Sequence, residues 1–192
     1  MSTEIKICGV NDVDFAVEAE RLGADYLGFI FAEESPRRVT AAFVLAAARR
    51  LKGTSRRVGV FTETPIPEIV GQARACGLKI VQLHRRASVQ EVAELRANGF
   101  EVWTLAGGAA GDAVLFDASH GDGETTLRKG PFKAVLAGGI SADTVERALE
   151  SGADVIDVSG SLERSRGVKS VERLRGFFTA VEGAKGKVEG KC

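Results

Sequence analysis

Short apolar runs rich in β-formers alternate with helical patterns along almost the whole chain, and this alternation restricts the possible folds more than any other feature. The run EIKIC (residues 4–8), for example, precedes a segment in which Phe15 and Leu22 keep a helical spacing and Gly23 supplies a stop signal. The strand-like runs are apolar without strict alternation, as in parallel strands that are covered on both faces. About eight such strands, most of them joined by short helices, predict a (β/α)8 TIM barrel.

The 192 residues fall short of the roughly 250 that are typical of this barrel, so we expect a trimmed version. Two connections are too short or too rich in glycine for a full helix, namely AGGAAGD (residues 106–112) and SHGDGETTLRKGP (residues 119–131). Helices are therefore expected to be weak or missing after strands five and six. An open doubly wound sheet, which also alternates strands with helices, is the main alternative.

Length and composition limit the organisation of the chain and its partners. Residues 1–182 suffice for a single barrel domain, and we expect the polar, glycine-rich tail at residues 183–192 to be disordered. The 26 basic residues balance the 26 acidic residues, and no basic block occurs along the chain. This balance argues against a nucleic acid or a membrane surface as a partner.

The cysteines and the apolar runs bear on the cellular compartment. The three cysteines are widely scattered and form no CxxC pair, which argues against a disulfide framework or a structural zinc site. No apolar run reaches the length of a membrane span, and the start MSTEIKICGV lacks the apolar stretch of a secretory signal. We therefore expect a cytoplasmic protein.

In a TIM barrel the reactive groups lie at the carboxyl ends of the strands. These ends supply a thiol, an imidazole, a carboxylate, arginines and glycine-rich turns. In chain order they are Cys8, Phe31 with the following SPRR (residues 35–38), Phe61, His84, Leu105, Asp117, Gly138 with Gly139, and Ser159 with Gly160.

Two glycine-rich turns follow the seventh and eighth strands, LAGGIS with Gly138 and Gly139, and DVSGS with Ser159 and Gly160. Backbone N–H groups that no Cβ atom shields can hold a phosphate, and barrels commonly bind phosphate after these two strands. Tight strand-to-helix turns also need glycine for conformational reasons. The occurrence of two such turns at these places nevertheless favours a phosphate site.

Cys8 and Asp117 each end an apolar strand. A carboxylic acid at such a rim can hold a proton to donate, although Asp is also a common turn cap. A free cysteine is often an inert core residue, but a thiol and a carboxylate at two strand ends can form a proton-transferring pair. Lys6 lies two residues before Cys8, on the same face of the strand, and is a candidate to lower the pKa of the thiol.

Arg37 and Arg38 follow the second strand in a loop stiffened by Pro36. An arginine fork can bind a carboxylate or a phosphate in a bidentate manner, whereas most loop arginines are simply solvated. His84 ends the run VQLH and is a candidate acid, base or hydrogen-bonded strand cap. The histidines and cysteines show no metal-ligand spacing, so we expect no metal site.

Several motifs together resemble those of the phosphoribosylanthranilate isomerases, barrel enzymes of tryptophan biosynthesis. The resemblance covers Ile5 to near Phe178 and keeps the family's order of motifs. These are KICGV (residues 6–10), GADYLGFIF (23–31), SPR (35–37), RVGVF (57–61), VQLH (81–84), LAGGIS (136–141) and DVSGSLE (157–163).

The resemblance implies an Amadori rearrangement of an aminoaldose to an aminoketose without cofactor or metal. It makes Cys8 the general base that takes the proton from the sugar C2′, and Asp117 the general acid that protonates the furanose ring oxygen. Arg37 would bind the anthranilate carboxylate, and we add His84 at the same rim as a substrate-binding candidate. The phosphate would be held by the two glycine-rich turns, at Gly138, Gly139, Ser159 and Gly160.

Four places depart from the family pattern, and one of them is the end of strand five, where the family usually has a lysine and VWTLAGG (residues 102–108) has none. Arg85 stands where the family usually has glycine, HGDGETTL (residues 120–127) replaces a glycine-rich stretch after the acid, and SGS replaces SSG after strand eight. Two alternatives stay open: a phosphate-binding barrel that isomerises a related aminoaldose, and a diverged barrel that binds a phosphorylated ligand without turnover. In each case we expect one small phosphorylated molecule as the partner, and a monomer or homodimer.

Overall fold

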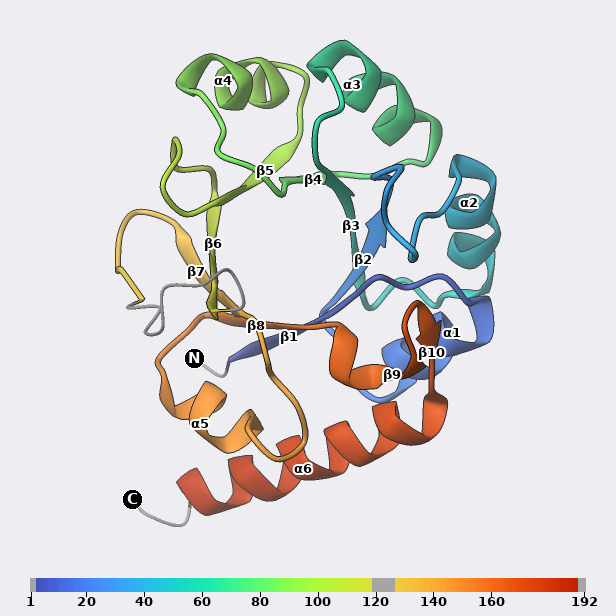
Figure 1. Cartoon of the computed structure of the whole chain (residues 1–192), viewed down its shortest axis with the longest axis vertical. Helices are drawn as coiled ribbons and strands as arrows, with labels where there is room; N and C mark the ends of the chain where they lie inside the picture. Colours follow the sequence, from blue (N-terminus) through green and yellow to red (C-terminus); the bar gives the residue numbers. More distant parts are fainter. Residues whose placement is uncertain (1–2, 119–126, 190–192) are drawn as a thin grey trace.

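The structure of the chain is a computed structural model, which describes residues 3–118 and 127–189. Eight parallel strands form a closed barrel in sequence order (Figure 1). β1 pairs with β8 to close the ring, so the TIM barrel predicted from the sequence is confirmed and the open doubly wound sheet is wrong. The strands are β1 (Glu4–Cys8), β2 (Tyr26–Ile30), β3 (Arg56–Phe61), β4 (Ile80–Leu83), β5 (Glu101–Leu105), β6 (Ala113–Asp117), β7 (Lys133–Ala137) and β8 (Val155–Val158).

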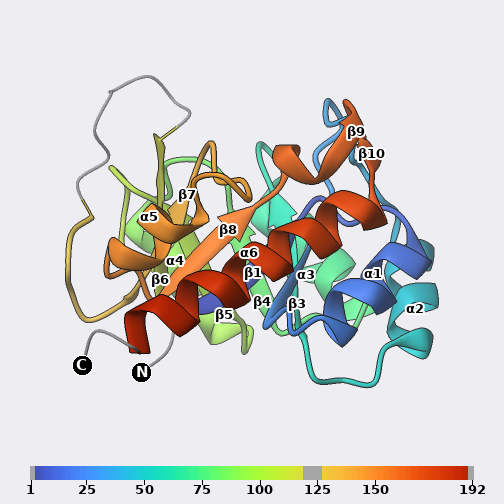
Figure 2. The same ribbon diagram turned by 90° about the horizontal axis from the view of Figure 1, so that it is seen from below.

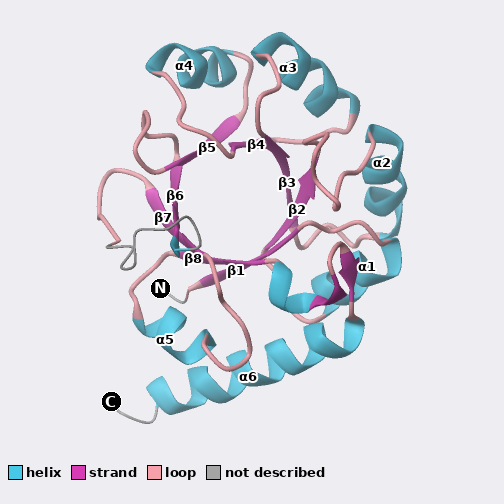
Figure 3. Ribbon diagram, in the orientation of Figure 1, coloured by secondary structure: helices cyan, strands magenta, loops and turns pink. Residues whose placement is uncertain are grey.

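Helices surround the ring of strands (Figure 3). They are α1 (Val13–Arg21), α2 (Ala41–Arg50), α3 (Ile66–Ala75), α4 (Val89–Ala97), α5 (Val145–Glu150) and α6 (Val171–Glu189). Local signals fix their starts: Asp12 accepts a hydrogen bond from Phe15 N at 2.7 Å, and Ser88 and Glu91 form a capping box at α4. The buried faces of the helices pack against the outside of the barrel in one apolar cluster.

The connection from β5 to β6 contains no helix. A Cβ atom on Gly108 would lie 2.7 Å from Ala87 N, and one on Gly111 would lie 2.2 Å from Val102 O. This turn therefore lies directly on its neighbours and needs glycine for that approach. The described part of the connection from β6 to β7 also lacks an α-helix, while residues 119–126, with most of the HGDGETTL stretch, lie outside the described residues. The trimmed barrel is confirmed.

Side chains fill the barrel interior and close its amino-terminal end. Tyr26 and Trp103 meet edge to face there, with ring centroids 4.9 Å apart. Lys133 Nζ binds Glu4 Oε2 at 2.6 Å at the same end. Cys8 belongs to the same interior cluster but lies at its carboxyl-terminal end. The barrel can therefore open to a ligand at that end.

The connection from β8 to α6 carries elements that the sequence did not predict. They are the 3₁₀ helix η2 (Gly160–Leu162) and a hairpin of β9 (Glu163–Ser165) and β10 (Val168–Lys169). Figure 2 shows this hairpin projecting above α1 and the start of α6. It lies on the carboxyl-terminal side of the barrel (Figure 2), where Glu163 contacts Arg37 of the SPRR loop.

The last helix is longer than the sequence indicated. α6 continues to Glu189, so residues 183–189, which we expected to be disordered, are helical. Val181 and Ala184 are buried, and this packing continues the helix past Gly183. Residues 190–192 lie outside the described residues. Within the described chain, no helix combines the length and the apolar character needed to cross a membrane.

Candidate active site

A cavity of about 520 Å³ opens at the carboxyl ends of the barrel strands. Its volume is typical of sites for small ligands. Eight residues singled out from the sequence all line it: Cys8, Arg37, His84, Asp117, Gly138, Gly139, Ser159 and Gly160. The fold thus brings together side chains and turns that are far apart in the chain.

Cys8 ends β1 and points into the barrel, with 8% of the residue exposed. It lies opposite Gly28 of β2 in the strand register. A Cβ atom on Gly28 would lie 2.8 Å from Cys8 Sγ and 3.2 Å from Lys6 Nζ. Glycine at position 28 therefore leaves the space in which the thiol and the ammonium lie side by side, on the same face of β1 as expected from the spacing.

Lys6 lies beneath Cys8 and is fully buried, with its Nζ 2.6 Å from Asp157 Oδ2. Lys6 and Asp157 lie opposite each other in the register of β1 and β8. Asp157 also lines the cavity, and its Oδ1 has no hydrogen-bond partner among the described residues. A buried acceptor without a donor is costly, so this oxygen is suited to accept a hydrogen bond from a ligand.

The protonation of Cys8 reflects two opposing effects. Burial raises the pKa of the thiol, and the positive charge of Lys6 lowers it without cancelling the effect of burial. Burial also disfavours the charged form of Lys6, but the charge of Asp157, the interaction with Cys8 and the hydrogen bonds to both residues together outweigh this effect, and the pKa of Lys6 is raised. Lys6 thus stays charged beside Cys8 and provides the counter-charge that a thiolate needs.

Asp117 is the last residue of β6 and lies opposite Ala137 of β7. In the ring, β7 and β8 separate β6 from β1. Asp117 and Cys8 therefore face the cavity from different sides. One proton donor and one proton acceptor can then reach different atoms of the same bound molecule.

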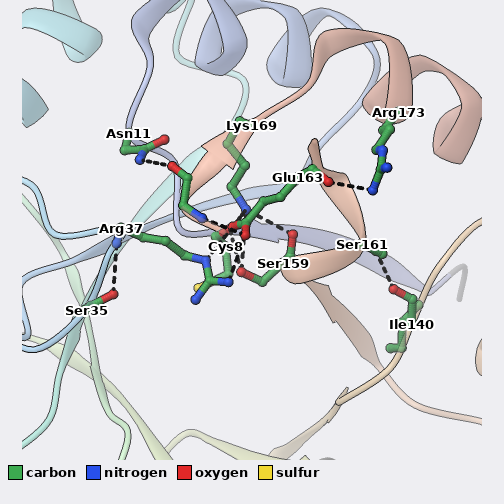
Figure 4. A network of polar contacts seen from close by, with 11 residues as sticks. Cys8, Asn11, Ser35, Arg37, Ile140, Ser159, Ser161, Glu163, Lys169 and Arg173 are labelled. Carbon is green, nitrogen blue, oxygen red and sulfur yellow. Dashed lines mark hydrogen bonds and ion pairs between the residues drawn. The ribbon is translucent and has the colours of Figure 1, made fainter. Parts of the chain in front are cut away.

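The two arginines of the SPRR loop have different surroundings. Arg37 lines the cavity and binds both carboxylate oxygens of Glu163, with its Nη2 3.0 Å from Oε2 (Figure 4). Arg38 instead binds Glu33 at 3.0 Å, and these side chains are 51% and 84% exposed. The structure therefore singles out Arg37 as the arginine that can contact a ligand.

His84 follows β4, and its backbone N–H donates to Phe61 O at 2.8 Å. Its Nδ1 lies 3.4 Å from Gln82 Nε2, and both side chains line the cavity. Gln82 is buried, and its Oε1 has no hydrogen-bond partner among the described residues. Arg85, one of the departures from the family pattern, donates to Thr62 O at 2.7 Å and binds Glu91 at 2.7 Å, so it is held outside the cavity.

The two glycine-rich turns lie side by side at the cavity. Gly138 and Gly139 have φ angles of 90° and 66°, which only glycine adopts at low cost. Ser161 Oγ donates to Ile140 O at 2.6 Å and joins the turn after β8 to the turn after β7. Ser159 Oγ donates to Cys8 O at 3.1 Å and joins the same turn to β1. The turns are thus fixed relative to the thiol.

Glu163 and Lys169 of the hairpin complete the charges near Cys8, and neither residue was expected there from the sequence. Lys169 Nζ lies 3.2 Å from Glu163 Oε1 and 3.0 Å from Ser159 O. The cations on this side of the cavity are Lys6, Arg37 and Lys169, and they face the carboxylates of Asp157 and Glu163. This excess of positive charge favours an anionic ligand. The sequence signal that could have pointed to Glu163 is its place as the last residue of the DVSGSLE motif.

Across the ranges that the structure describes, no group of three or more His, Cys, Asp or Glu side chains is placed to hold a metal ion. The arrangement can give one proton from a carboxyl group and take another with a thiolate, beside turns suited to a phosphate and an arginine suited to a carboxylate.

Comparisons with known proteins give a consistent result. The model of the N-(5′-phosphoribosyl)anthranilate isomerase family matches residues 5–180. A relative named N-(5′-phosphoribosyl)anthranilate isomerase, from Granulibacter bethesdensis, is 35% identical over 96% of this chain and 100% of its own length.

Solved structures agree with the sequence comparison. The phosphoribosylanthranilate isomerase of Thermus thermophilus superposes with a TM-score of 0.82 and 28% identity, over 94% of this chain and 99% of its own. A phosphoribosylanthranilate isomerase in complex with reduced 1-(o-carboxyphenylamino)-1-deoxyribulose 5-phosphate superposes with a TM-score of 0.80 at 23% identity, over 94% of this chain and 99% of its own. The similarity to this complex supports the shared fold.

Proposed function

Because the chain belongs to the N-(5′-phosphoribosyl)anthranilate isomerase family, we propose that its cavity converts N-(5′-phosphoribosyl)anthranilate into the corresponding 1-deoxyribulose 5-phosphate. The reaction is an Amadori rearrangement in tryptophan biosynthesis. One observation carries the assignment of the site: Cys8 and Asp117 line the same cavity as two glycine-rich turns and Arg37.

In the first step, Asp117 gives a proton to the ring oxygen of the ribose. The bond between this oxygen and C1′ breaks, and the lone pair of the anthranilate nitrogen forms a protonated Schiff base with C1′. Asp117 suits this task because it faces the cavity from β6, on a different side from Cys8, so that the two groups can reach different atoms of the substrate.

In the second step, the Cys8 thiolate takes the proton from C2′. The electrons of the C2′–H bond move toward the Schiff base nitrogen and form an enolamine, which tautomerises to the ketone. The positive charge of the Schiff base favours the thiolate, as does Lys6 beneath it. Cys8 is therefore a thiol before substrate binds and is ionised most readily when the base is needed.

The remaining contacts orient the substrate. The turns at Gly138, Gly139, Ser159 and Gly160 bind the phosphate through backbone N–H groups. Arg37 binds the anthranilate carboxylate and His84 contacts the substrate at the same rim. The buried acceptors Asp157 Oδ1 and Gln82 Oε1 take hydrogen bonds from sugar hydroxyl groups, which satisfies both atoms.

We also propose that the protein acts in the cytoplasm, as a monomer or a homodimer, with one small phosphorylated substrate as its partner. The free cysteines Cys8 and Cys76 are both buried, which suits a reducing compartment.

The test is turnover by the full chain without added metal or cofactor. Freshly made phosphoribosylanthranilate should lose its fluorescence faster with the protein than in buffer, and the Cys8→Ala variant should return the rate nearly to that of buffer. A protein that shows no turnover, yet is protected from heat by reduced 1-(o-carboxyphenylamino)-1-deoxyribulose 5-phosphate, would instead be a binding protein.

A further inference from the structure

We propose that Glu163 is a positioning residue that holds the Arg37 guanidinium in place for the carboxylate of the substrate before the substrate binds. This inference rests on the proposed function and deepens it, because it assigns the selection of a carboxylated arylamine to a pair of residues. Glu163 itself touches Arg37 rather than the substrate.

The first observation is the geometry of the pair. Arg37 donates from Nε and Nη2 to the two oxygens of Glu163, so the carboxylate holds one edge of the planar guanidinium (Figure 4). A guanidinium has five N–H donors in a rigid fork, and this pairing uses two of them. Within the described chain no other acceptor binds this group, and Arg37 lines the cavity. The remaining donors are therefore available to a planar anion.

The second observation is that Glu163 is itself fixed. Its carboxylate also accepts from Gly167 N at 2.9 Å and from Lys169 Nζ, and its side chain is 5% exposed. Burial raises the pKa of Glu163, but the hydrogen bonds from Arg37 and Gly167 and the charge of Lys169 outweigh this effect and lower the pKa to about 2. The carboxylate stays ionised and has no freedom to turn away from Arg37.

The hairpin that carries Glu163 is tied down on both sides. Asn11 Nδ2, from the loop after β1, donates to Gly167 O at 2.8 Å, and Arg173 of α6 donates to Glu163 O (Figure 4). The position of Glu163 therefore depends on β1 and α6, which belong to the rigid part of the barrel. Because these contacts fix Glu163 relative to the barrel, Glu163 can hold Arg37 in a fixed position relative to the barrel as well.

The third observation is the close packing around Arg37. A Cβ atom on Gly9 would lie 2.5 Å from Arg37 Cδ, and one on Gly167 would lie 2.8 Å from Pro36 O. The SPRR loop thus packs on two glycines, one from the loop after β1 and one from the hairpin. Because both approaches are tight, the Arg37 side chain is confined before any ligand arrives, and less conformational freedom is lost on binding.

The neighbouring pair of Arg38 and Glu33 offers an internal comparison. It has the same chemistry, but its side chains lie in solvent, where an ion pair contributes little. Glu33→Gln is therefore a matched control for Glu163→Gln, since both changes remove one carboxylate charge from one arginine of the same loop.

The experiment is a double-mutant cycle with Glu163→Gln and Arg37→Ala. For each variant, kcat and KM for phosphoribosylanthranilate are measured, together with the Kd of reduced 1-(o-carboxyphenylamino)-1-deoxyribulose 5-phosphate and of inorganic phosphate. Glu163→Gln should raise KM and the Kd of the reduced compound about 10- to 100-fold, because misplacing a binding group by an ångström has effects of this size. kcat should change much less, and the Kd of phosphate should stay the same. Glu33→Gln should match the wild type.

The cycle distinguishes positioning from general stability. In the Arg37→Ala background, Glu163→Gln should cause no further loss of affinity for the reduced compound. Additive losses, or an equal loss of affinity for inorganic phosphate, would overturn the inference. If Glu163→Gln does not fold, Glu163→Asp keeps the charge but shortens the side chain, and its Kd should lie between those of the wild type and Arg37→Ala. A wild-type Kd in that variant would also overturn it.

Failure of the inference and failure of the proposed function give different results. If the wild-type protein turns over phosphoribosylanthranilate and Glu163→Gln shows the same KM and Kd values, only the inference about Glu163 is overturned. A wild-type protein with neither turnover nor affinity for the reduced compound overturns the proposed function and the inference with it.

Discussion

Lys6 Nζ and Asp157 Oδ2 lie 2.6 Å apart beneath the Cys8 thiol, and both side chains are buried. Replacing a buried ion pair by apolar residues is often neutral for stability, so the pair needs another explanation than folding energy. Its two charges act in opposite directions on Cys8: Lys6 lowers the pKa of the thiol and Asp157 raises it. The pair therefore sets the local electrostatic potential at the proposed base.

Two substitutions in this pair should shift the pH dependence in opposite directions. kcat/KM should rise with pH as free Cys8 ionises, because the thiolate is the active form and its pKa is raised. Asp157→Asn removes the charge that opposes ionisation, so the rise should move to lower pH. Lys6→Met removes the charge that favours it, so the rise should move to higher pH. Each shift should be on the order of one pH unit.

The measurement is the pH profile of kcat/KM, with thermal melts to show that each variant folds. Lys6→Met leaves a buried carboxylate unpaired and should be destabilised by about 3–5 kcal/mol, so Asp157→Asn is the more informative variant. Asp14→Asn, whose carboxylate is 82% exposed on α1, serves as the control and should leave the profile unchanged. Identical profiles for all variants would remove the pair from the mechanism.

The two buried cysteines should differ in their contribution to activity. Cys8→Ala should lower kcat about 100- to 10,000-fold, the usual contribution of a general base, while the melting temperature changes little. Cys76→Ala is the control, because Cys76 is buried like Cys8 but caps the C-terminus of α3 away from the cavity. Its kcat should stay at the wild-type value. Wild-type kcat in Cys8→Ala would exclude the thiol as the base.

Asp117 and Asp112 lie at opposite ends of β6 and should affect different properties. Asp117→Asn cannot donate the proton that opens the ring, so kcat should fall about 100- to 10,000-fold with little change in the melting temperature. Asp112 binds Val102 N at 2.7 Å and Arg96 at 2.8 Å, outside the cavity. Asp112→Asn should therefore lower the melting temperature and preserve kcat. The reverse pattern would show that Asp117 has a structural role.

The barrel and the candidate site could be predicted because both follow from local signals. Apolar runs and helical spacing predicted the order of strands. The closed barrel places Cys8, His84 and Asp117 at one end because each of them ends a strand or directly follows one. The spacing of two residues between Lys6 and Cys8 was enough to place both side chains on the same face.

The hairpin could not be predicted for a physical reason. ERSRGVK (residues 163–169) has charged residues and a glycine, a composition typical of a solvated loop. Glu163 is buried by tertiary contacts, among them the contact with Arg37, which lies 126 positions earlier in the chain. The length of α6 was missed for a similar reason, since the burial of Ala184 depends on tertiary packing rather than on its glycine-rich surroundings.

Gly9→Ala should impair substrate binding beyond the strain that it introduces. Gly9 has a φ of 72°, and Gly53 has a φ of 84°, so alanine at either position costs about 1–2 kcal/mol of stability. A Cβ atom at Gly53 would meet nothing within 4 Å, whereas one at Gly9 would displace Arg37. Both variants should melt at lower temperature, but only Gly9→Ala should raise KM for phosphoribosylanthranilate. Equal KM values would show that the position of Arg37 tolerates this displacement.

Glu163 should contribute to the loss of stability in acid. Its pKa in the folded protein is about 2, below the ordinary value of 4.5, so its contribution is complete above about pH 4.5 and is lost as the pH falls toward 2. For a nearly buried side chain this shift corresponds to about 3 kcal/mol. The free energy of unfolding, measured with urea between pH 7 and pH 2.5, should therefore fall less in acid for Glu163→Gln than for the wild type, which gives the variant a flatter acid limb. Glu33→Gln removes a carboxylate that is 84% exposed and should reproduce the wild-type limb. Parallel curves for all three proteins would mean that the Arg37–Glu163 pair does not stabilise the fold, and that its hydrogen bonds serve only to place the guanidinium.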